Sequence, residues 1–146
     1  MSGSHGIVLT RERERNRPWA ERLRAAGHAV REMPLLRFTP LDPPEDYDVA
    51  GFDWIMFTSP QGVRAFHEAG LRPGTARIAT LGPGTAAALG EYGWVDALGL
   101  RCRDGVELAQ AFLATVAETG RVLLPGPARR GSEPRASLMT AGFDVR

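Results

Sequence analysis

The chain has 146 residues, of which 43% are hydrophobic and 24% charged, and its formal net charge is +1. These values describe one globular domain of ordinary size, and they provide no global attraction to nucleic acid or to a membrane surface. No apolar run approaches the roughly 18 residues of a membrane-spanning helix. Residues 1–5 lack the layout of a signal peptide and are expected to be an unstructured tail.

Cysteine and histidine are scarce. Cys102 is the only cysteine and the three histidines are scattered, which excludes an internal disulfide and a cysteine-based metal site. We therefore expect a cytoplasmic protein without a metal. Every basic side chain is arginine. A GC-rich genome produces this bias, but guanidinium groups also suit carboxylates and phosphates, and composition leaves both interpretations open.

The first forty residues predict a strand, a helix and a second extended segment. Residues 7–9 read as a short buried strand, and residues 11–17 as a charged loop or a helix start. A helical pattern follows over 18–26. The inner face of this helix is expected to carry Trp19, Leu23 and Ala26. Gly27 ends the helix, and residues 29–38 continue as an extended edge segment. A Pro- and Asp-rich linker over 40–46 then marks the best candidate for a domain boundary.

The most informative stretch follows this linker. Trp54–Phe57 is an uninterrupted apolar run, which is typical of a strand buried on both faces of a parallel sheet. Ser59 is a good N-cap, and Pro60 suits the first helical position because its missing N–H costs nothing there. Val63 and Phe66 begin the buried stripe of the helix.

Later stretches repeat this alternation. Strands are expected at 77–81, 94–100, 121–124 and 143–145. Helices are expected at 86–92, after a capping box at 104–107, and after an N-cap at Ser132, with Leu138 and Ala141 inside the last one. Strands alternating with helices predict βαβ units and a parallel sheet, and they fit neither a helix bundle nor a β-sandwich.

Three strand-to-helix turns share one composition: residues 58–62, 82–85 and 125–129. In a parallel sheet all three emerge at the same edge. Their helix starts provide backbone N–H groups and the positive ends of helix dipoles, and together they would suit several anionic groups. Gly, Pro and Ser are also ordinary turn residues, so both interpretations stay open at this point.

Established catalytic and nucleotide motifs are incomplete. Gly82-Pro83-Gly84 lacks the third glycine of a dinucleotide site, and without lysine there is no P-loop. The strand ends lack the acidic cluster of a response regulator, and Ser59 lacks a nucleophile elbow. The sequence therefore identifies no catalytic residue and no metal ligand.

Four stretches carry a resemblance to the uroporphyrinogen-III synthase family. Asp53–Val63, with Phe57-Thr58-Ser59 at its centre, resembles the family's Phe-Thr-Ser-x-x-Gly/Ala-Val signature. Ile78–Ala86 resembles its Val-Gly-x-x-Thr-Ala stretch, and Leu123–Val145 resembles a later strand–helix–strand. Val8–Arg11 fits the family's start, and the four stretches occur in the family's order.

The resemblance implies two α/β domains joined by a two-stranded ladder, the first domain being built from both ends of the chain. Residues 1–37 would then be the opening βαβ segment of an incomplete first domain. Residues 38–146 would form a nearly complete second domain, a flavodoxin-like three-layer α/β domain with a parallel sheet. Because family members are much longer, we expect a partial chain.

The implied activity is that of a hydro-lyase. Hydroxymethylbilane, a linear tetrapyrrole with many carboxylates, is cyclised to uroporphyrinogen III with loss of water and inversion of ring D, without a metal or organic cofactor. The proton donor is not identified. The expected substrate contacts are Thr10, Arg11, Thr58, Ser59, Gln61, Gly62, Gly84, Thr85, Gly126 and Arg129.

Two other functions remain open from the sequence. One is a non-catalytic α/β module that binds an anionic small molecule or a protein partner. The other is a nucleotide or nucleotide-sugar binding domain, against which the incomplete glycine motifs argue. For the incomplete first domain, the uncovered face of the helix around Trp19 predicts self-association or a loosely ordered N-terminus. No nucleic-acid or membrane partner is expected.

Overall fold

The computed structural model describes residues 6–43, 47–128 and 131–146. By its contacts the chain divides into two compact units, Met1–Thr39 and Pro40–Arg146, called here the N-terminal and the C-terminal unit. The division falls close to the boundary expected from the sequence. The expected tail, residues 1–5, lies outside the described residues, as does part of the expected linker.

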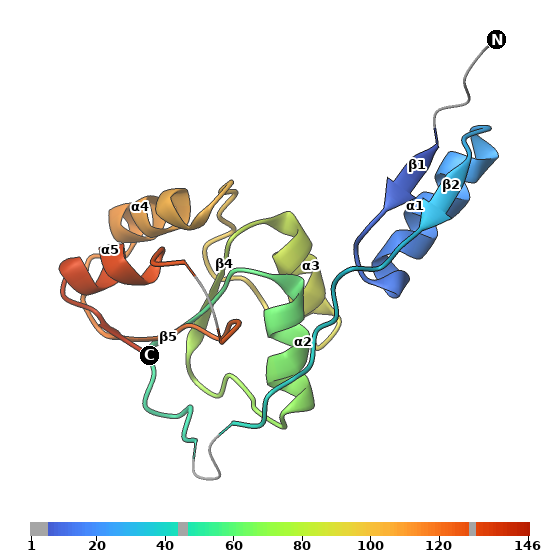
Figure 1. Cartoon of the computed structure of the whole chain (residues 1–146). Helices are drawn as coiled ribbons and strands as arrows, with labels where there is room; N and C mark the ends of the chain where they lie inside the picture. The colour runs from blue at the N-terminus through green and yellow to red at the C-terminus, as the bar shows by residue number, and fades with distance from the viewer. Residues whose placement is uncertain (1–5, 44–46, 129–130) are drawn as a thin grey trace. The chain divides into compact units, whose positions relative to one another are not determined.

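The N-terminal unit is a βαβ segment (Figure 1). It consists of β1 (Ile7–Leu9), α1 (Arg13–Ala25) and β2 (Val30–Glu32), and β1 pairs with β2 in parallel. Gly27 adopts φ +86° after the helix, as expected for its glycine stop. Residues 11–17 were expected to be a charged loop or a helix start, and the second is confirmed, because α1 begins at Arg13 and Pro18 lies inside it. Residues 13–17 are almost all Arg and Glu, which are good helix formers.

The expected buried face of α1 is also wrong. Asn16 and Ala20 are the buried residues of the helix, whereas Trp19 is 54% exposed and Arg22 lies over its ring. Leu23 is half-buried and Ala26 is exposed. Because α1 covers one face of β1 only, Val8 on the other face is 48% exposed, and the prediction of a buried strand fails there.

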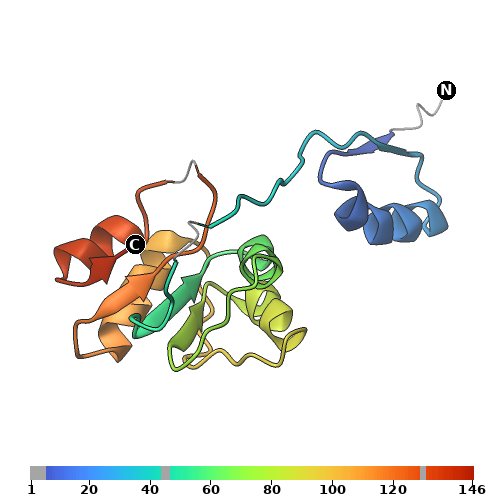
Figure 2. The same cartoon turned by 90° about the horizontal axis from the view of Figure 1, so that it is seen from below.

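The C-terminal unit is a three-layer α/β domain, which confirms the expected fold class. Its parallel sheet has the order β4-β3-β5-β6. The strands are β3 (Trp54–Phe57), β4 (Arg77–Thr80), β5 (Arg121–Leu123) and β6 (Asp144–Val145). The helices are α2 (Pro60–Glu68), α3 (Pro83–Gly90), α4 (Gly105–Thr115) and α5 (Arg135–Thr140). Helices α2 and α3 cover one face of the sheet, and α4 and α5 the other (Figure 2).

Two apolar clusters, one on each face of the sheet, form the core. Ile55 and Phe57 of β3 point toward α2 and α3, where they meet Val63, Phe66 and Leu89. Trp54 and Met56 alternate with them and pack toward the other helices. These partners include Leu108, Phe112 and Leu138. All four residues of β3 are buried, as predicted for a central strand of a parallel sheet.

Three local predictions in this unit are wrong. Residues 94–100 form no strand, although Ala97 donates a hydrogen bond to the Ile78 carbonyl at 2.8 Å. Helix α3 begins at Pro83, so residues 83–85 belong to the helix instead of preceding it. Ser132 does not cap α5, which begins at Arg135 after Pro134, and Ala141 is exposed while Leu138 is buried.

Two predicted helix starts are confirmed. Ser59 Oγ accepts a hydrogen bond from the Gly62 N–H at 3.1 Å, and Pro60 is the first helical residue. Asp104 Oδ1 accepts from the N–H groups of Val106 and Glu107 at 3.0 Å each. In a complete capping box Glu107 would also accept a hydrogen bond from the Asp104 N–H, and here its partner differs. The Glu107 carboxylate binds the guanidinium and the backbone N–H of Arg103, and these hydrogen bonds lower the pKa of Glu107 to about 2.

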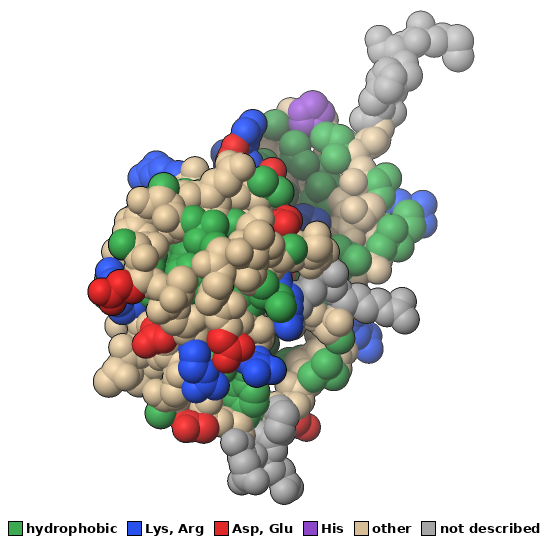
Figure 3. Space-filling model, turned by 90° about the vertical axis from the view of Figure 1, so that its left-hand side faces the viewer, with side chains coloured by type: hydrophobic (Ala, Val, Ile, Leu, Met, Phe, Trp, Pro, Cys, Tyr) green, Lys and Arg blue, Asp and Glu red, His purple; other side chains and the backbone are tan. Residues whose placement is uncertain are grey.

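Charged side chains of both signs lie next to one another on the face of the molecule drawn in Figure 3. One exposed ion pair joins helix α2 to the end of helix α3. The Arg64 guanidinium donates to both oxygens of Glu91 at 2.8 and 3.2 Å, which lowers the pKa of Glu91. Because both side chains are exposed, the pair contributes little to stability.

The two serines at predicted helix starts provide a matched test of the N-cap. We expect Ser59→Ala to lower the free energy of unfolding by about 1 kcal/mol, because the Gly62 N–H loses its acceptor. Ser132→Ala should leave it unchanged, since Ser132 makes no cap bond to α5. Urea unfolding followed by tryptophan fluorescence measures both, and equal effects of the two substitutions would contradict the assignment.

Candidate functional site

The three turns singled out from the sequence lie side by side. Strands β4, β3 and β5 are neighbours in the parallel sheet, so the turns that follow them emerge in this order at one edge. Helices α2 and α5 leave this edge on opposite faces of the sheet. The carboxyl ends of β3 and β5 therefore form a topological switch point, the kind of place where open α/β sheets bind ligands.

Glycine allows the turns after β3 and β5 to touch. A Cβ atom placed on Gly62 would lie 3.3 Å from the Pro125 carbonyl oxygen and 3.5 Å from Ser59 Oγ. Contacts this short leave room for hydrogen but not for a methyl group without some displacement. Gly62 thus keeps two of the three turns together at the switch point.

The turn after β3 retains fewer donors for a ligand than the sequence indicated. Pro60 has no N–H, and the Gly62 N–H already donates to Ser59 Oγ. Ser59 still has its hydroxyl proton to donate, and both Thr58 and Ser59 are half-buried at the sheet edge. Gln61 and Gly62 are half-buried as well. The hydroxyl groups, more than the backbone amides, are what this turn offers an anion.

In the turn after β4, Gly84 is the accessible residue. The N–H groups of Thr85 and Ala86 both donate to the Gly82 carbonyl at 3.0 Å, and Pro83 has no N–H. The Gly84 N–H has no hydrogen-bond partner within the described part of the chain, and Gly84 is exposed. Thr85, by contrast, is only 5% exposed. Its hydroxyl is therefore less available than the sequence predicted.

A buried polar contact beneath this turn was missed by the sequence analysis. Thr80, the last residue of β4, is fully buried and donates its hydroxyl proton to Asp96 Oδ2 at 2.7 Å. Asp96 Oδ1 accepts from the Leu98 N–H at 3.1 Å. The available signal was Asp96 itself, a carboxylate at an inward position of the alternating stretch 94–100.

The turn after β5 is the most open of the three. Pro125 is half-buried, while Gly126, Pro127 and Ala128 are exposed. Arg129, the cation expected to pair with a carboxylate, lies outside the described residues. Its role stays a prediction.

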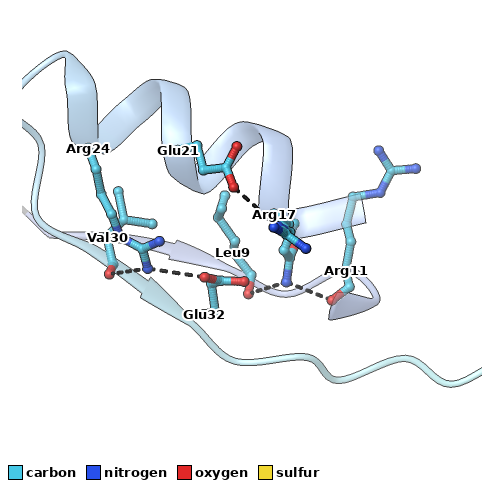
Figure 4. A network of polar contacts seen from close by, with 8 residues as sticks. Leu9, Arg11, Arg17, Glu21, Arg24, Val30 and Glu32 are labelled. Carbon is cyan, nitrogen blue, oxygen red and sulfur yellow. Dashed lines mark hydrogen bonds and ion pairs between the residues drawn. The ribbon is translucent and has the colours of Figure 1, made fainter. Parts of the chain in front are cut away.

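Thr10 and Arg11 belong to the N-terminal unit, where they follow the carboxyl end of β1 and are exposed. Asn16 organises this turn. Its side chain is 1% exposed, and Nδ2 donates to the carbonyls of Leu9 at 3.1 Å and Arg11 at 2.7 Å. Figure 4 shows these two carbonyls, with the Arg11 guanidinium directed away from them. An asparagine inside a helical pattern gave no sign of this role.

The described concavities lie elsewhere. One of about 640 Å³ is found at the amino ends of the strands, opposite the three turns. It is lined by Trp54 and Arg77, whose guanidinium lies 4.3 Å over the indole ring, and by the segment 115–120. Ligands of parallel sheets bind at the carboxyl ends of the strands, so the turn edge remains the better candidate.

Neither a metal centre nor a membrane span is found in the described residues. Within 6–43, 47–128 and 131–146, no three His, Cys, Asp or Glu side chains are grouped so that they could hold an ion. No helix in these ranges is long and apolar enough to cross a membrane. Burial raises the pKa of the Cys102 thiol, the only one in the chain. This thiol is therefore a poor nucleophile.

The comparisons with known proteins agree on one family. Residues 17–146 match the family model described as uroporphyrinogen-III synthase HemD, and the chain belongs to this family. It is 29% identical over 153 aligned residues to the chloroplastic uroporphyrinogen-III synthase of Oryza sativa subsp. japonica, covering 95% of this chain and 50% of that protein. It is 28% identical over 130 residues to the porphyrin biosynthesis protein HemD of Ruminiclostridium josui, covering 81% of this chain and 26% of that protein.

Solved structures show the same fold. A mutant uroporphyrinogen III synthase from Thermus thermophilus matches 97% of this chain with a TM-score of 0.63 at 20% sequence identity, and 60% of that chain is covered. The enzyme from Helicobacter pylori matches 76% of this chain with a TM-score of 0.52 at 19% identity. The chain thus spans about half the length of the rice relative and about a quarter of the HemD relative.

Two glycines of the candidate site provide a matched test of its packing. Gly84→Ala should leave the free energy of unfolding unchanged or raise it by up to about 1 kcal/mol, because a Cβ there meets nothing within 4 Å and alanine favours the helix. Gly62→Ala should be about 1 kcal/mol less stable than Gly84→Ala, because its methyl group presses on Pro125. Urea unfolding compares them. If both variants are equally stable, the turns after β3 and β5 do not touch.

Proposed function

We propose that this chain forms one wall of the substrate site of a uroporphyrinogen-III synthase. The whole enzyme would cyclise hydroxymethylbilane to uroporphyrinogen III, with loss of water and inversion of ring D. The observation that carries the proposal is the row of three strand-to-helix turns at one edge of a domain that matches this family. The site residues named from the sequence stay proposals within it.

The chemistry of the turn edge suits a ligand with several carboxylates. Helices α2 and α3 direct the positive ends of their dipoles to this edge. Ser59 and Thr58 can donate hydroxyl protons, and the Gly84 N–H is unpaired within the described residues. Arg129 would add a cation to this edge. Separated donors of this kind fit carboxylates spread around a large ring better than a single phosphate.

The reaction requires the departure of a hydroxyl group and closure of the ring in a folded geometry. The resulting pyrrolic cation is stabilised by resonance, so positioning and electrostatics can supply much of the catalysis. An acid is needed to assist the leaving hydroxyl. We assign no residue to this step.

We further propose that the N-terminal unit is the opening segment of a first domain that needs more chain. A parallel two-stranded sheet covered on one face only leaves apolar surface exposed, and parallel sheets are normally covered on both faces. A cytoplasmic location, expected from the single cysteine, also remains a proposal. The rice relative is named as chloroplastic.

Cyclisation of enzymatically generated hydroxymethylbilane tests the activity. Spontaneous closure gives isomer I, so the fraction of isomer III separated by chromatography is the measure. We expect isomer I alone from this chain and isomer III from a version extended beyond Arg146 by the sequence of its source gene. In the extended version, Ser59→Ala should lower the yield of isomer III, whereas Ser132→Ala should not.

Isomer I from both versions, with both of them folded, would refute the enzyme assignment. Tight binding of an anionic small molecule without cyclisation would then favour a non-catalytic module.

Self-association through the N-terminal unit is also proposed, because its uncovered sheet face exposes Val8 and Met33. Sedimentation velocity should show concentration-dependent association of this chain. Val8→Glu should reduce it, because the charge lies on the uncovered face. Val106→Glu is the control, since Val106 in the other unit is similarly exposed, at 46% against 48%. A monomer at all concentrations with full amide-exchange protection of residues 7–26 would contradict the proposal.

A further inference from the structure

Hydrogen bonds join the carboxyl end of β4 to the segment 94–102, next to the turn between β4 and α3. The buried Thr80 hydroxyl donates to Asp96 Oδ2 at 2.7 Å, and the Leu98 N–H donates to Oδ1 of the same carboxylate at 3.1 Å. The Cys102 N–H donates to the Leu81 carbonyl at 2.9 Å. One carboxylate therefore joins two separate pieces of chain through hydrogen bonds to an ionised group, which are stronger than neutral ones.

The residues joined by these contacts also border the turn that presents Gly84. Thr80 Oγ1 lies 3.5 Å from the Gly82 carbonyl oxygen. That oxygen accepts the N–H groups of Thr85 and Ala86 at 3.0 Å each. A Cβ on Gly82 would lie 3.6 Å from the Cys102 carbonyl, so the same segment also borders the turn from the side. Gly84, two residues after Gly82, is exposed, and its N–H has no hydrogen-bond partner within the described residues.

We propose that Asp96 is a positioning residue for this turn: by holding Thr80 and the segment 94–102 together, it aims the Gly84 N–H at a carboxylate of the substrate. The inference rests on the proposed function, because it requires the turn to bind a carboxylate. Asp96 itself need not touch the substrate. Nothing in the family match or in the sequence motifs assigns this residue a role.

The direction in which Asp96→Asn changes the binding affinity distinguishes a positioning role from an effect of charge alone. A negative charge close to an anion site weakens binding by repulsion, so a carboxylate that acted only through its charge would give tighter binding when neutralised. A carboxylate that acts through geometry would give weaker binding, because the amide of asparagine has one acceptor oxygen where two donors converge. Asp96→Asn therefore raises affinity in the first case and lowers it in the second.

The probe for the experiment is uroporphyrin I, a stable macrocycle with eight carboxylates, and the readout is its dissociation constant measured by fluorescence. We expect Asp96→Asn and Thr80→Val each to weaken binding roughly tenfold, the size of loss found when a supporting hydrogen bond is removed from a metal site. The double variant should lose little more than either single one, because both remove the same contact. Thr80→Ser keeps the hydroxyl and should retain the affinity of the unmodified chain.

Glu91→Gln is the matched control. It removes one negative charge from the same unit, at the carboxyl end of α3 and away from the turns. We expect it to leave the dissociation constant within about twofold of that of the unmodified chain. Salt screens the interaction between an exposed charge at the carboxyl end of α3 and a ligand at its amino end. Unfolding curves identify variants that are folded under the assay conditions, and Asp96→Asn with Thr80→Ser keeps the test possible if Thr80→Val does not fold.

Unchanged or tighter binding by Asp96→Asn would overturn the inference. Failure of the unmodified, folded chain to bind uroporphyrin I would count against the proposed carboxylate site itself. In that case amide exchange still tests the positioning, because Asp96→Asn should speed exchange at Thr85 and Ala86, which donate to Gly82. If their exchange rates equal those in Glu91→Gln, Asp96 does not hold the turn.

Discussion

The burial of β3 on both faces is the constraint on which the C-terminal unit depends. Its four residues have no exposed side, so the strand must lie between two neighbouring strands and two layers of helices. The central position also fixes the order of the turns at the edge. Because β4 lies on one side of β3 and β5 on the other, the turn that begins at Thr58 lies at the switch point, with the two other turns beside it.

The structure also limits how this edge can bind an anion. A helix start is often described as a ready set of free amides, but here the chain uses most of them internally. The Gly62 N–H donates to Ser59 Oγ, and two N–H groups of α3 donate to the Gly82 carbonyl. Among the described residues of the turns after β3 and β4, the groups that stay available to a ligand include the Thr58 and Ser59 hydroxyl protons and the Gly84 N–H, together with the helix dipoles. Separated donors of this kind would suit the proposed large ligand, which they could contact at several points.

The sequence predicted those features whose cause is local. The apolar run of β3, the Ser59 cap and the glycine stop at Gly27 each depend on residues within a few positions, and all three are confirmed. Features that depend on distant partners were missed. Asp96 is defined by Thr80, sixteen positions away. The inner face of α1 was wrong because a buried Asn16, which a hydrophobic pattern does not count, takes the place of an apolar residue.

Asn16 and Asp96 lie in different units but share one arrangement. Each is a polar side chain tied to the end of a parallel strand, with Asn16 donating to two carbonyls and Asp96 accepting from two donors. Removing a polar group from water costs free energy unless its hydrogen bonds are replaced, and an apolar side chain would fill the same space at lower cost. What the apolar side chain could not do is fix the path of the backbone just beyond the strand. In both units that backbone carries proposed substrate contacts, namely Thr10 and Arg11 in one and Gly84 in the other. These polar side chains therefore contribute to the geometry of the strand-to-helix turns more than to the packing beside them.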